Sequence, residues 1–235
     1  MAVTKQLIEY QLADVVFEGV AIWDERIVEK RPGVLVAHTW HGRNDFAISQ
    51  AAELASLGYT GFALDMYGKG ILGRNVAENS ALMRPFMDDR RLVSDRMRAA
   101  LEIVSGLETV DSERIAAVGF CFGGLCVLDL ARSGAELAGV VSFHGLLTRP
   151  VGTRTGVIHP KVLVLHGASD SLVPMADVTA LGDELSAAGA DWQMNIYSGA
   201  EHGFAVVDGH PASVADRAAR RAHEAAHAFL AEVLS

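Results

Sequence analysis

A cysteine set between glycines is the residue of this sequence best suited to chemistry. Cys121 lies in the run Gly119-Phe120-Cys121-Phe122-Gly123, after an apolar segment and before a helical one. Such a strand-to-helix turn pushes its central side chain outward, and the flanking glycines leave room for it. The helix N-terminus favours a thiolate at Cys121, and the backbone N–H of Phe122 can face an oxyanion. The pattern predicts a nucleophile. A glycine-rich turn around a buried structural cysteine is the alternative.

A cysteine nucleophile needs a base, and the base needs a group that orients it. Asp170 follows the apolar run Val162–His166, and His202 follows the run Gln193–Tyr197, each in a short loop. Both loops come after predicted strands, as Cys121 does, so parallel strands would bring all three to one sheet edge. We predict a Cys121–His202–Asp170 triad. Taken singly, Asp170 could be a helix cap and His202 a loop residue.

The elements that must position these residues alternate along the chain. Short apolar runs predict strands at Val15–Ile22, Val34–His38, Thr60–Leu64, Arg114–Gly119, Gly139–Phe143, Lys161–His166 and Gln193–Tyr197. Segments of helical period lie at about 45–57, 87–107, 122–133, 176–188 and 212–234. Alternation with apolar central strands predicts an α/β fold, a three-layer sandwich whose mostly parallel sheet carries helices on both faces. No linker divides residues 1–235, so we expect one domain.

Composition narrows the class of protein. The chain has 235 residues, 50 % of them hydrophobic, and a net charge of −9. An acidic surface argues against nucleic acid or an anionic membrane as partner. No apolar run is long enough to span a membrane, and the two cysteines form no disulfide framework. We expect a cytoplasmic protein, with a small molecule as its partner.

The sequence resembles the dienelactone hydrolase family of α/β-hydrolases, from the strand at Val34 to the last helix. The resemblance rests on the segments G-F-C-F-G-G, H-G-A-S-D-S-L-V-P and E-H-G-F. It implies an α/β-hydrolase-like fold, a triad of Cys121, Asp170 and His202, and no cofactor or metal. It also implies that backbone N–H groups of Phe122 and Trp40 form the oxyanion hole.

Three positions depart from the family pattern. Thr39 stands where characterised lactonases carry a glutamate that holds the resting thiol, and threonine cannot accept a proton. Val206 and Lys69 stand where those enzymes bind the substrate carboxylate with arginines. Lysine keeps the charge but lacks the fork of a guanidinium. We therefore expect a less anionic substrate, with Thr39, His41, Lys69 and Phe204 as candidate substrate contacts.

Other chemistry-bearing residues are assigned structural roles. His144 and His166 are expected to make structural hydrogen bonds beneath the site, and Cys126 to pack in the core. His223 and His227 are expected on the surface of the last helix, and the arginines of residues 90–98 on a solvated helix face. No metal-ligand spacing such as H-E-x-x-H occurs, so no metal site is predicted.

The resulting prediction is a carboxylic ester hydrolase that cleaves a small ester, lactone or thioester through an acyl-cysteine intermediate. The alternative is a ligand-binding or thiol-sensing protein that uses the same scaffold without turnover. The oligomeric state is left as monomer or homodimer.

Overall fold

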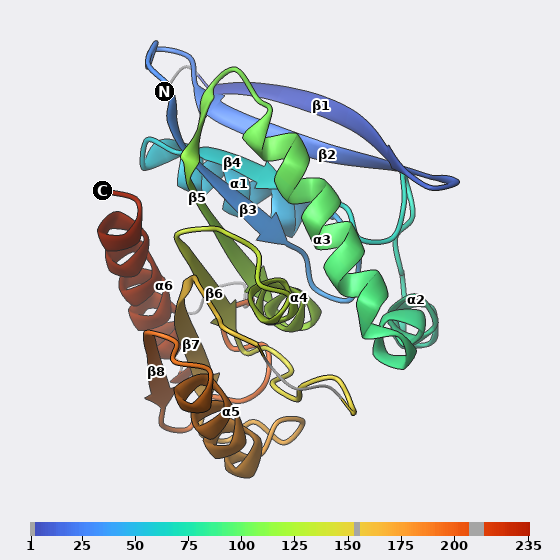
Figure 1. The fold of residues 1–235 in the computed structure, drawn as a ribbon. Coiled ribbons are helices and arrows are strands. Elements are labelled where there is room, and N and C mark those ends of the chain that lie inside the picture. The colour runs from blue at the N-terminus through green and yellow to red at the C-terminus, as the bar shows by residue number, and fades with distance from the viewer. Residues whose placement is uncertain (1–2, 153–155, 207–213) are drawn as a thin grey trace. The chain divides into compact units, whose positions relative to one another are not determined.

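Strands and helices alternate along the chain, as the sequence predicts. The computed structural model describes residues 3–152, 156–206 and 214–235 (Figure 1). In chain order the elements are β1 (Val3–Leu12), β2 (Val15–Asp24), β3 (Arg31–Ala37), α1 (Asp45–Ser56), β4 (Thr60–Ala63), α2 (Val76–Asp88), α3 (Arg90–Ser105), β5 (Val110–Phe120), α4 (Phe122–Arg132), β6 (Gly139–Phe143), β7 (Lys161–Gly167), α5 (Met175–Ala187), β8 (Trp192–Tyr197) and α6 (Val214–Val233). The first two residues of the helix predicted at 212–234 lie outside the described residues.

The described strands form a mostly parallel sheet of eight, in the order β1-β2-β4-β3-β5-β6-β7-β8. The pairs β3–β4, β6–β7 and β7–β8 are parallel, whereas β1–β2 and β2–β4 are antiparallel. By its contacts the chain divides into two compact units, Met1–Ala117 and Val118–Ser235. The prediction of one domain stays a prediction. Within the described residues, no helix is long and apolar enough to cross a membrane.

In the first unit, helices cover both faces of the strands. A side chain at Gly61 of β4 would collide with Ala51 of α1, and one at Gly33 of β3 would approach Val104 of α3. Val34 pairs with Gly61 and so faces α1, while its neighbour Gly33 faces the other way. Figure 1 accordingly shows α3 in front of these strands and α1 behind them.

In the second unit, α4 and α6 lie on opposite faces of β6 (Figure 1). Ser142 faces α4, where its Oγ lies close to the place a side chain on Gly124 would occupy. The next residue, Phe143, faces α6, and its ring centroid lies 5.0 Å from that of His223. Successive residues of a strand point to opposite faces, so β6 is buried between two helices. The expected layering is therefore present in each unit.

Several details differ from the sequence-based expectations. Strand β1 is absent from the predicted strands. It is an edge strand with mostly exposed polar residues, so its sequence lacks the apolar run by which the other strands were predicted. Helix α2 is absent from the predicted helices, and only its last two residues fall within the helix predicted at about 87–107. The prediction that Arg96 lies on a solvated face is wrong: its guanidinium stacks on Phe17 and Phe86. His223 is half-buried against Phe143 rather than on the surface, whereas Cys126 is buried in α4 as expected.

Candidate active site

Cys121 lies on the turn between β5 and α4. Its backbone has φ 56° and ψ −113°, in a region that residues other than glycine rarely adopt. The turn is held by its own N–H, which donates to the Phe143 carbonyl of β6 at 3.0 Å. The carbonyl of Cys121 accepts from the Gly124 N–H at 3.0 Å, which begins α4. A strained residue that its neighbours hold in place is a mark of a functional site.

The glycines around Cys121 are required by close backbone contacts. A Cβ on Gly119 would lie 2.0 Å from the Gly123 carbonyl oxygen. A Cβ on Gly124 would lie 2.6 Å from the Cα of Gly145, which follows β6. Neither contact can relax without moving backbone. The motif therefore serves to bring the start of α4 against the ends of β5 and β6.

Asp170 is held rigidly in the loop between β7 and α5. Its side chain is fully buried, and its Oδ1 accepts hydrogen bonds from the N–H groups of Leu172 at 2.9 Å and Val173 at 3.0 Å. The other oxygen, Oδ2, lies 2.8 Å from Nδ1 of His202. One carboxylate oxygen thus anchors the loop, and the other is left to orient the imidazole.

The loops after β7 and β8 lie against each other, which brings Asp170 to His202. The Ser169 N–H donates to the Ala200 carbonyl at 2.9 Å, and the Ala168 N–H to the Tyr197 carbonyl at 2.9 Å. A Cβ on Gly167 would lie 2.4 Å from the Ala200 oxygen, so this approach needs glycine. Gly167 is not among the residues singled out from the sequence. Its place directly after an apolar strand is the available signal.

His202 joins the other two residues. Its Nε2 lies 3.2 Å from the Cys121 Sγ, and its Nδ1 faces Asp170. Burial by itself lowers the pKa of His202, but the hydrogen bonds and charges of Cys121 and Asp170 outweigh it and raise that pKa to about 9. At neutral pH the imidazole therefore carries both protons, with the Nε2 proton directed at sulfur. This chain of contacts can supply a proton donor, a proton acceptor and a nucleophile.

Phe122 and Phe204, two further candidate site residues, lie on different elements. Phe122 is the first residue of α4, directly after Cys121, and its side chain is buried. Phe204 is buried too, with its ring 5.6 Å from that of His144 and 5.5 Å from that of Tyr197. Phe204 therefore packs between the loop after β6 and strand β8, against His144 and Tyr197. The predicted contact between Phe204 and substrate stays a prediction.

The early-loop candidates belong to the first unit. The hydroxyl of Thr39 lies 3.0 Å from Nδ1 of His41, and the Trp40 carbonyl accepts from the Tyr67 hydroxyl at 3.1 Å. Partial burial lowers the pKa of His41. The preceding His38 is buried, and its Nε2 accepts from the Met66 N–H at 3.1 Å. This loop is thus internally hydrogen-bonded, and the substrate and oxyanion roles of its residues stay predictions.

Lys69 is engaged with carboxylates of its own unit. Its ammonium pairs with Glu9 and lies 3.8 Å from a Glu18 oxygen. The Glu9 hydrogen bond raises the pKa of Lys69, so the side chain stays charged. Glu9 already balances that charge, while Glu18 is also paired with Arg43 at 2.6 Å. The Glu9 pair weakens Lys69 as a binder of an anionic substrate.

The predicted hydrogen bonds of His144 and His166 stay a prediction. Both side chains are buried. Neither ring nitrogen of His144 has a hydrogen-bond partner among the described residues, whereas His166 lies against the backbone of Val173. The centroid of the His144 ring lies 5.5 Å from that of His202. The sequence places His144 after a strand, but it does not reveal which side chains the ring meets.

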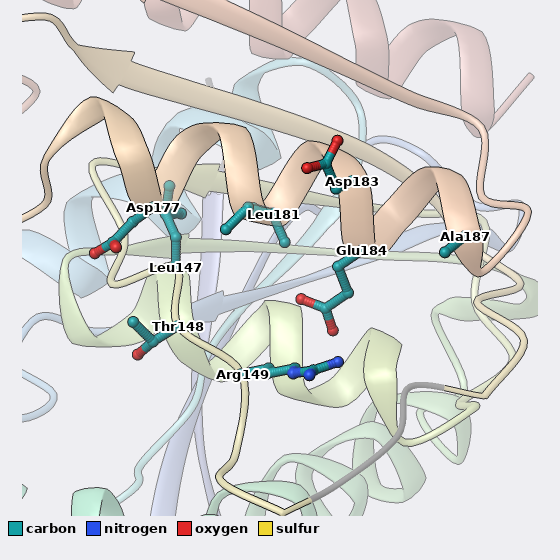
Figure 2. A pocket seen from close by; sticks show the side chains of 9 residues that line it. Leu147, Thr148, Arg149, Asp177, Leu181, Asp183, Glu184 and Ala187 are labelled. Carbon is teal, nitrogen blue, oxygen red and sulfur yellow. The ribbon is translucent and has the colours of Figure 1, made fainter.

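A cavity of about 440 Å³ lies apart from the triad residues, beside α5 (Figure 2). It is lined by Leu147–Arg149 and by residues of α5 that include Asp177, Asp183 and Glu184. Figure 2 shows Glu184 extending toward the loop from α5. Glu184 is already paired with Arg132 at 2.8 Å, so it serves the fold.

Comparison with known proteins gives one consistent result. A solved structure named m3DLH is 35 % identical over the whole of both chains, with a TM-score of 0.92. A dienelactone hydrolase-like promiscuous phosphotriesterase from metagenomic libraries is 32 % identical over the whole of both chains, with a TM-score of 0.90. A Methylorubrum extorquens protein, named as a candidate carboxymethylenebutenolidase, is 27 % identical over 185 residues, 74 % of this chain and 63 % of that protein.

These similarities agree with the expected fold. Residues 17–234 of the sequence also match the sequence model of the dienelactone hydrolase family. That match covers nearly all of both units. The chain therefore belongs to the dienelactone hydrolase family, a family of hydrolases of the α/β class.

Proposed function

We propose that this protein hydrolyses a small, uncharged carboxylic ester or lactone, with Cys121 as nucleophile. The contacts of His202 with the Cys121 Sγ at 3.2 Å and with Asp170 at 2.8 Å are the observation that carries the proposal. Family membership supports the reaction class. The engagement of Lys69 by Glu9 supports a substrate without a carboxylate.

The first half of the reaction forms an acyl-cysteine. The Cys121 thiolate attacks the carbonyl carbon, a C–S bond forms, and the carbonyl oxygen becomes an oxyanion. When this intermediate collapses, the C–O bond to the alcohol breaks, and the Nε2 proton of His202 passes to the leaving oxygen. With a pKa of about 9, His202 keeps that proton until it is transferred to the more basic leaving alkoxide.

The second half releases the acid. Acylation removes the thiolate that helps to raise the pKa of His202, so the imidazole becomes a better base. His202 then takes a proton from water, hydroxide attacks the thioester carbonyl, and the C–S bond breaks. The carboxylic acid leaves, and the thiolate and imidazolium are restored. The contact between His202 and Cys121 therefore explains both roles of His202, as proton donor in the first half and as base in the second.

Two further groups are assigned supporting roles. Asp170 stabilises the charged imidazole and holds its Nδ1, since its other oxygen is anchored by the backbone of the loop. The backbone N–H of Phe122 is one expected oxyanion donor, and such a donor is typically worth about 3–4 kcal/mol. Trp40, the second donor implied by family resemblance, belongs to the first unit and is part of the proposal only.

The test is hydrolysis of p-nitrophenyl acetate and butyrate under reducing conditions. We expect saturable turnover by the wild-type protein and a loss of at least about a thousandfold in Cys121→Ala. Cys126→Ala is the matched control, because Cys126 is the second cysteine of the chain and is buried within α4. It should keep turnover within about twofold.

Two outcomes would contradict the proposal. Equal activity in Cys121→Ala would remove Cys121 as nucleophile. No turnover by the wild type, together with rapid alkylation of Cys121 by iodoacetamide, would instead favour the thiol-sensing alternative. An intact-mass measurement after alkylation distinguishes a reactive thiol from an unfolded protein.

A second candidate substrate class comes from the phosphotriesterase relative, which matches over both whole chains. A thiolate can attack phosphorus as it attacks a carbonyl carbon, and displace an aryl oxide. Hydrolysis of p-nitrophenyl diethyl phosphate, measured beside the acetate ester, tests this class. Dependence of both activities on Cys121 would assign them to one site.

A further inference from the structure

His144 lies directly after β6, with its ring against the catalytic histidine proposed above. The His144 and His202 ring centroids are 5.5 Å apart, with the ring planes at 69°, so the contact is edge to face. The ring of Phe204 meets His144 in the same manner, at 5.6 Å. His144 itself has no exposed surface. The side of His202 that meets His144 is therefore covered by the His144 ring, which in turn packs against Phe204.

The backbone of His144 is held in an unusual conformation. Its φ is +36°, although it is not glycine, and its N–H donates to the Leu165 carbonyl of β7 at 2.8 Å. Among residues other than glycine, histidine is enriched in the left-handed region together with asparagine and aspartate. Histidine is the aromatic member of that group. A ring at this backbone position is therefore most easily supplied by histidine.

The nitrogens of His144 do not explain its presence. Neither ring nitrogen has a hydrogen-bond partner among the described residues, which is costly for a buried polar group. Burial, and then the charge of the neighbouring His202, lower the pKa of His144 to about 3. The imidazole is thus neutral at the pH where the hydrolase would act. What it offers to His202 is the surface of its ring.

We propose that His144 is a positioning residue whose ring holds His202 in line with Cys121 and Asp170. The proposal rests on the function proposed above, because it concerns the same triad. The neutral ring of His144, packed against Phe204, prevents the His202 imidazole from turning away from Cys121 and Asp170. It also keeps water from that side of the ring, and a low local dielectric strengthens the charge-assisted bond to Asp170.

Two substitutions separate the ring from the backbone. His144→Phe keeps a ring and removes both nitrogens, whereas His144→Asn suits the left-handed backbone but has no ring. The matched control is His223→Phe, because His223 is a nearby histidine of α6 whose ring packs at a tilt against Phe143. Turnover of p-nitrophenyl acetate gives kcat and KM for each variant.

A second readout does not depend on turnover. The rate of Cys121 alkylation by iodoacetamide, measured across the acidic and alkaline range, reports how the reactivity of the thiol depends on its contact with His202. The other titratable groups that face this pair of histidines are Asp170, His166 and His223. A change of fold alone would lower the amount of active protein without moving the midpoint of this profile.

We expect His144→Asn to lower kcat at least about tenfold with KM within about twofold, and to move the alkylation midpoint. His144→Phe and His223→Phe should keep kcat within about threefold and the midpoint unchanged. A folded His144→Asn with wild-type kcat and midpoint would overturn the proposal, as would a folded His144→Phe as impaired as His144→Asn. The second result would mean that a ring at this position is not enough to hold His202.

His144→Gly replaces His144→Asn if the latter does not fold, because glycine adopts the left-handed backbone without strain. Should the wild type hydrolyse no ester, a midpoint that moves in the ringless variant alone would support the positioning role and leave only the hydrolase assignment refuted. An active wild type with an unchanged ringless variant would refute only the positioning role.

Discussion

At the scale of single residues, the site depends on Asp170, whose two carboxylate oxygens have different hydrogen-bond partners. One accepts two backbone N–H groups of its own loop, and the other faces His202 at 2.8 Å. The carboxylate can therefore neither rotate nor find another partner without breaking the loop. This arrangement holds the imidazole in the orientation that directs Nε2 at the Cys121 sulfur.

Asp170→Asn should disturb the chemistry more than the fold. The amide can still accept from the backbone but cannot stabilise a charged His202, so the pKa of His202 should fall from about 9. We expect kcat for p-nitrophenyl acetate to drop on the order of a thousandfold. The pH profile of alkylation should shift as well. Asp177→Asn, in the first turn of α5, is the matched control. Wild-type kcat in Asp170→Asn would contradict the assignment.

At the scale of elements, two contacts hold the parts of the site together. Gly167 lets the loop after β7 reach the loop after β8, and Arg132 ties α4 to α5. The Arg132 guanidinium bonds Asp129 at 3.1 Å and Glu184 at 2.8 Å, and it also donates to the Leu147 carbonyl at 2.8 Å. Its side chain is only 6 % exposed, so these charges are largely removed from water.

Gly167→Ala should separate the two loops. Its Cβ would lie 2.4 Å from the Ala200 oxygen, so the backbone that carries Asp170 or His202 must move. Because a shift of about 1 Å at a catalytic group can cost about 100-fold, we expect kcat to fall at least about tenfold. Gly156→Ala is the control, since a side chain at Gly156 meets open space. Unchanged kcat in Gly167→Ala would show that the loops do not set the triad geometry.

Arg132→Met should destabilise the fold strongly. It removes the Arg132 cation from the buried carboxylates of Asp129 and Glu184, and losing one partner of a buried ion pair typically costs about 3–5 kcal/mol. The free energy of unfolding in urea measures the effect. Arg220→Met removes an exposed pair with Glu224 on α6 and should cost less than about 1 kcal/mol. Similar losses in both variants would mean that the buried cluster is not structural.

At the scale of the whole molecule, buried histidines should make stability depend on pH. Burial lowers the pKa of His38 to about 4 and that of His144 to about 3, while both have ordinary values near 6.5 in the unfolded chain. Below pH 6.5 the unfolded chain therefore binds protons that the folded one does not. His202 behaves in the opposite way, because its pKa is raised to about 9.

The midpoint of thermal unfolding should therefore fall as the pH drops from 6.5 to about 4. Each buried histidine should contribute on the order of 1 kcal/mol of lost stability per pH unit. The contribution of His202 is complete below pH 6.5 and is lost as the pH rises through about 9. Combining His38→Gln with His144→Phe should flatten the acid side of the profile. An equally steep acid side in that double variant would assign the effect to other groups.

The order of elements was predictable from local patterns. Apolar runs and helical periods marked most strands and helices to within a few residues, and the glycine-bracketed cysteine marked the turn before α4. Cys121, Asp170 and His202 could be named because each follows such a strand. Residues close together in the sequence determine the hydrophobic period of an element and the geometry of a turn. Both can therefore be predicted from a short segment.

The sequence alone thus determined the α/β class, the resemblance to a hydrolase family and the three residues to examine. The tertiary structure decided what each side chain meets: the 3.2 Å contact of His202 with Cys121, the ring of His144 against His202 and the contacts of Arg96 with two aromatic rings. The first of these contacts joins residues 81 positions apart in the chain. Such contacts depend on strand register and on how helices and loops pack, which no local pattern contains.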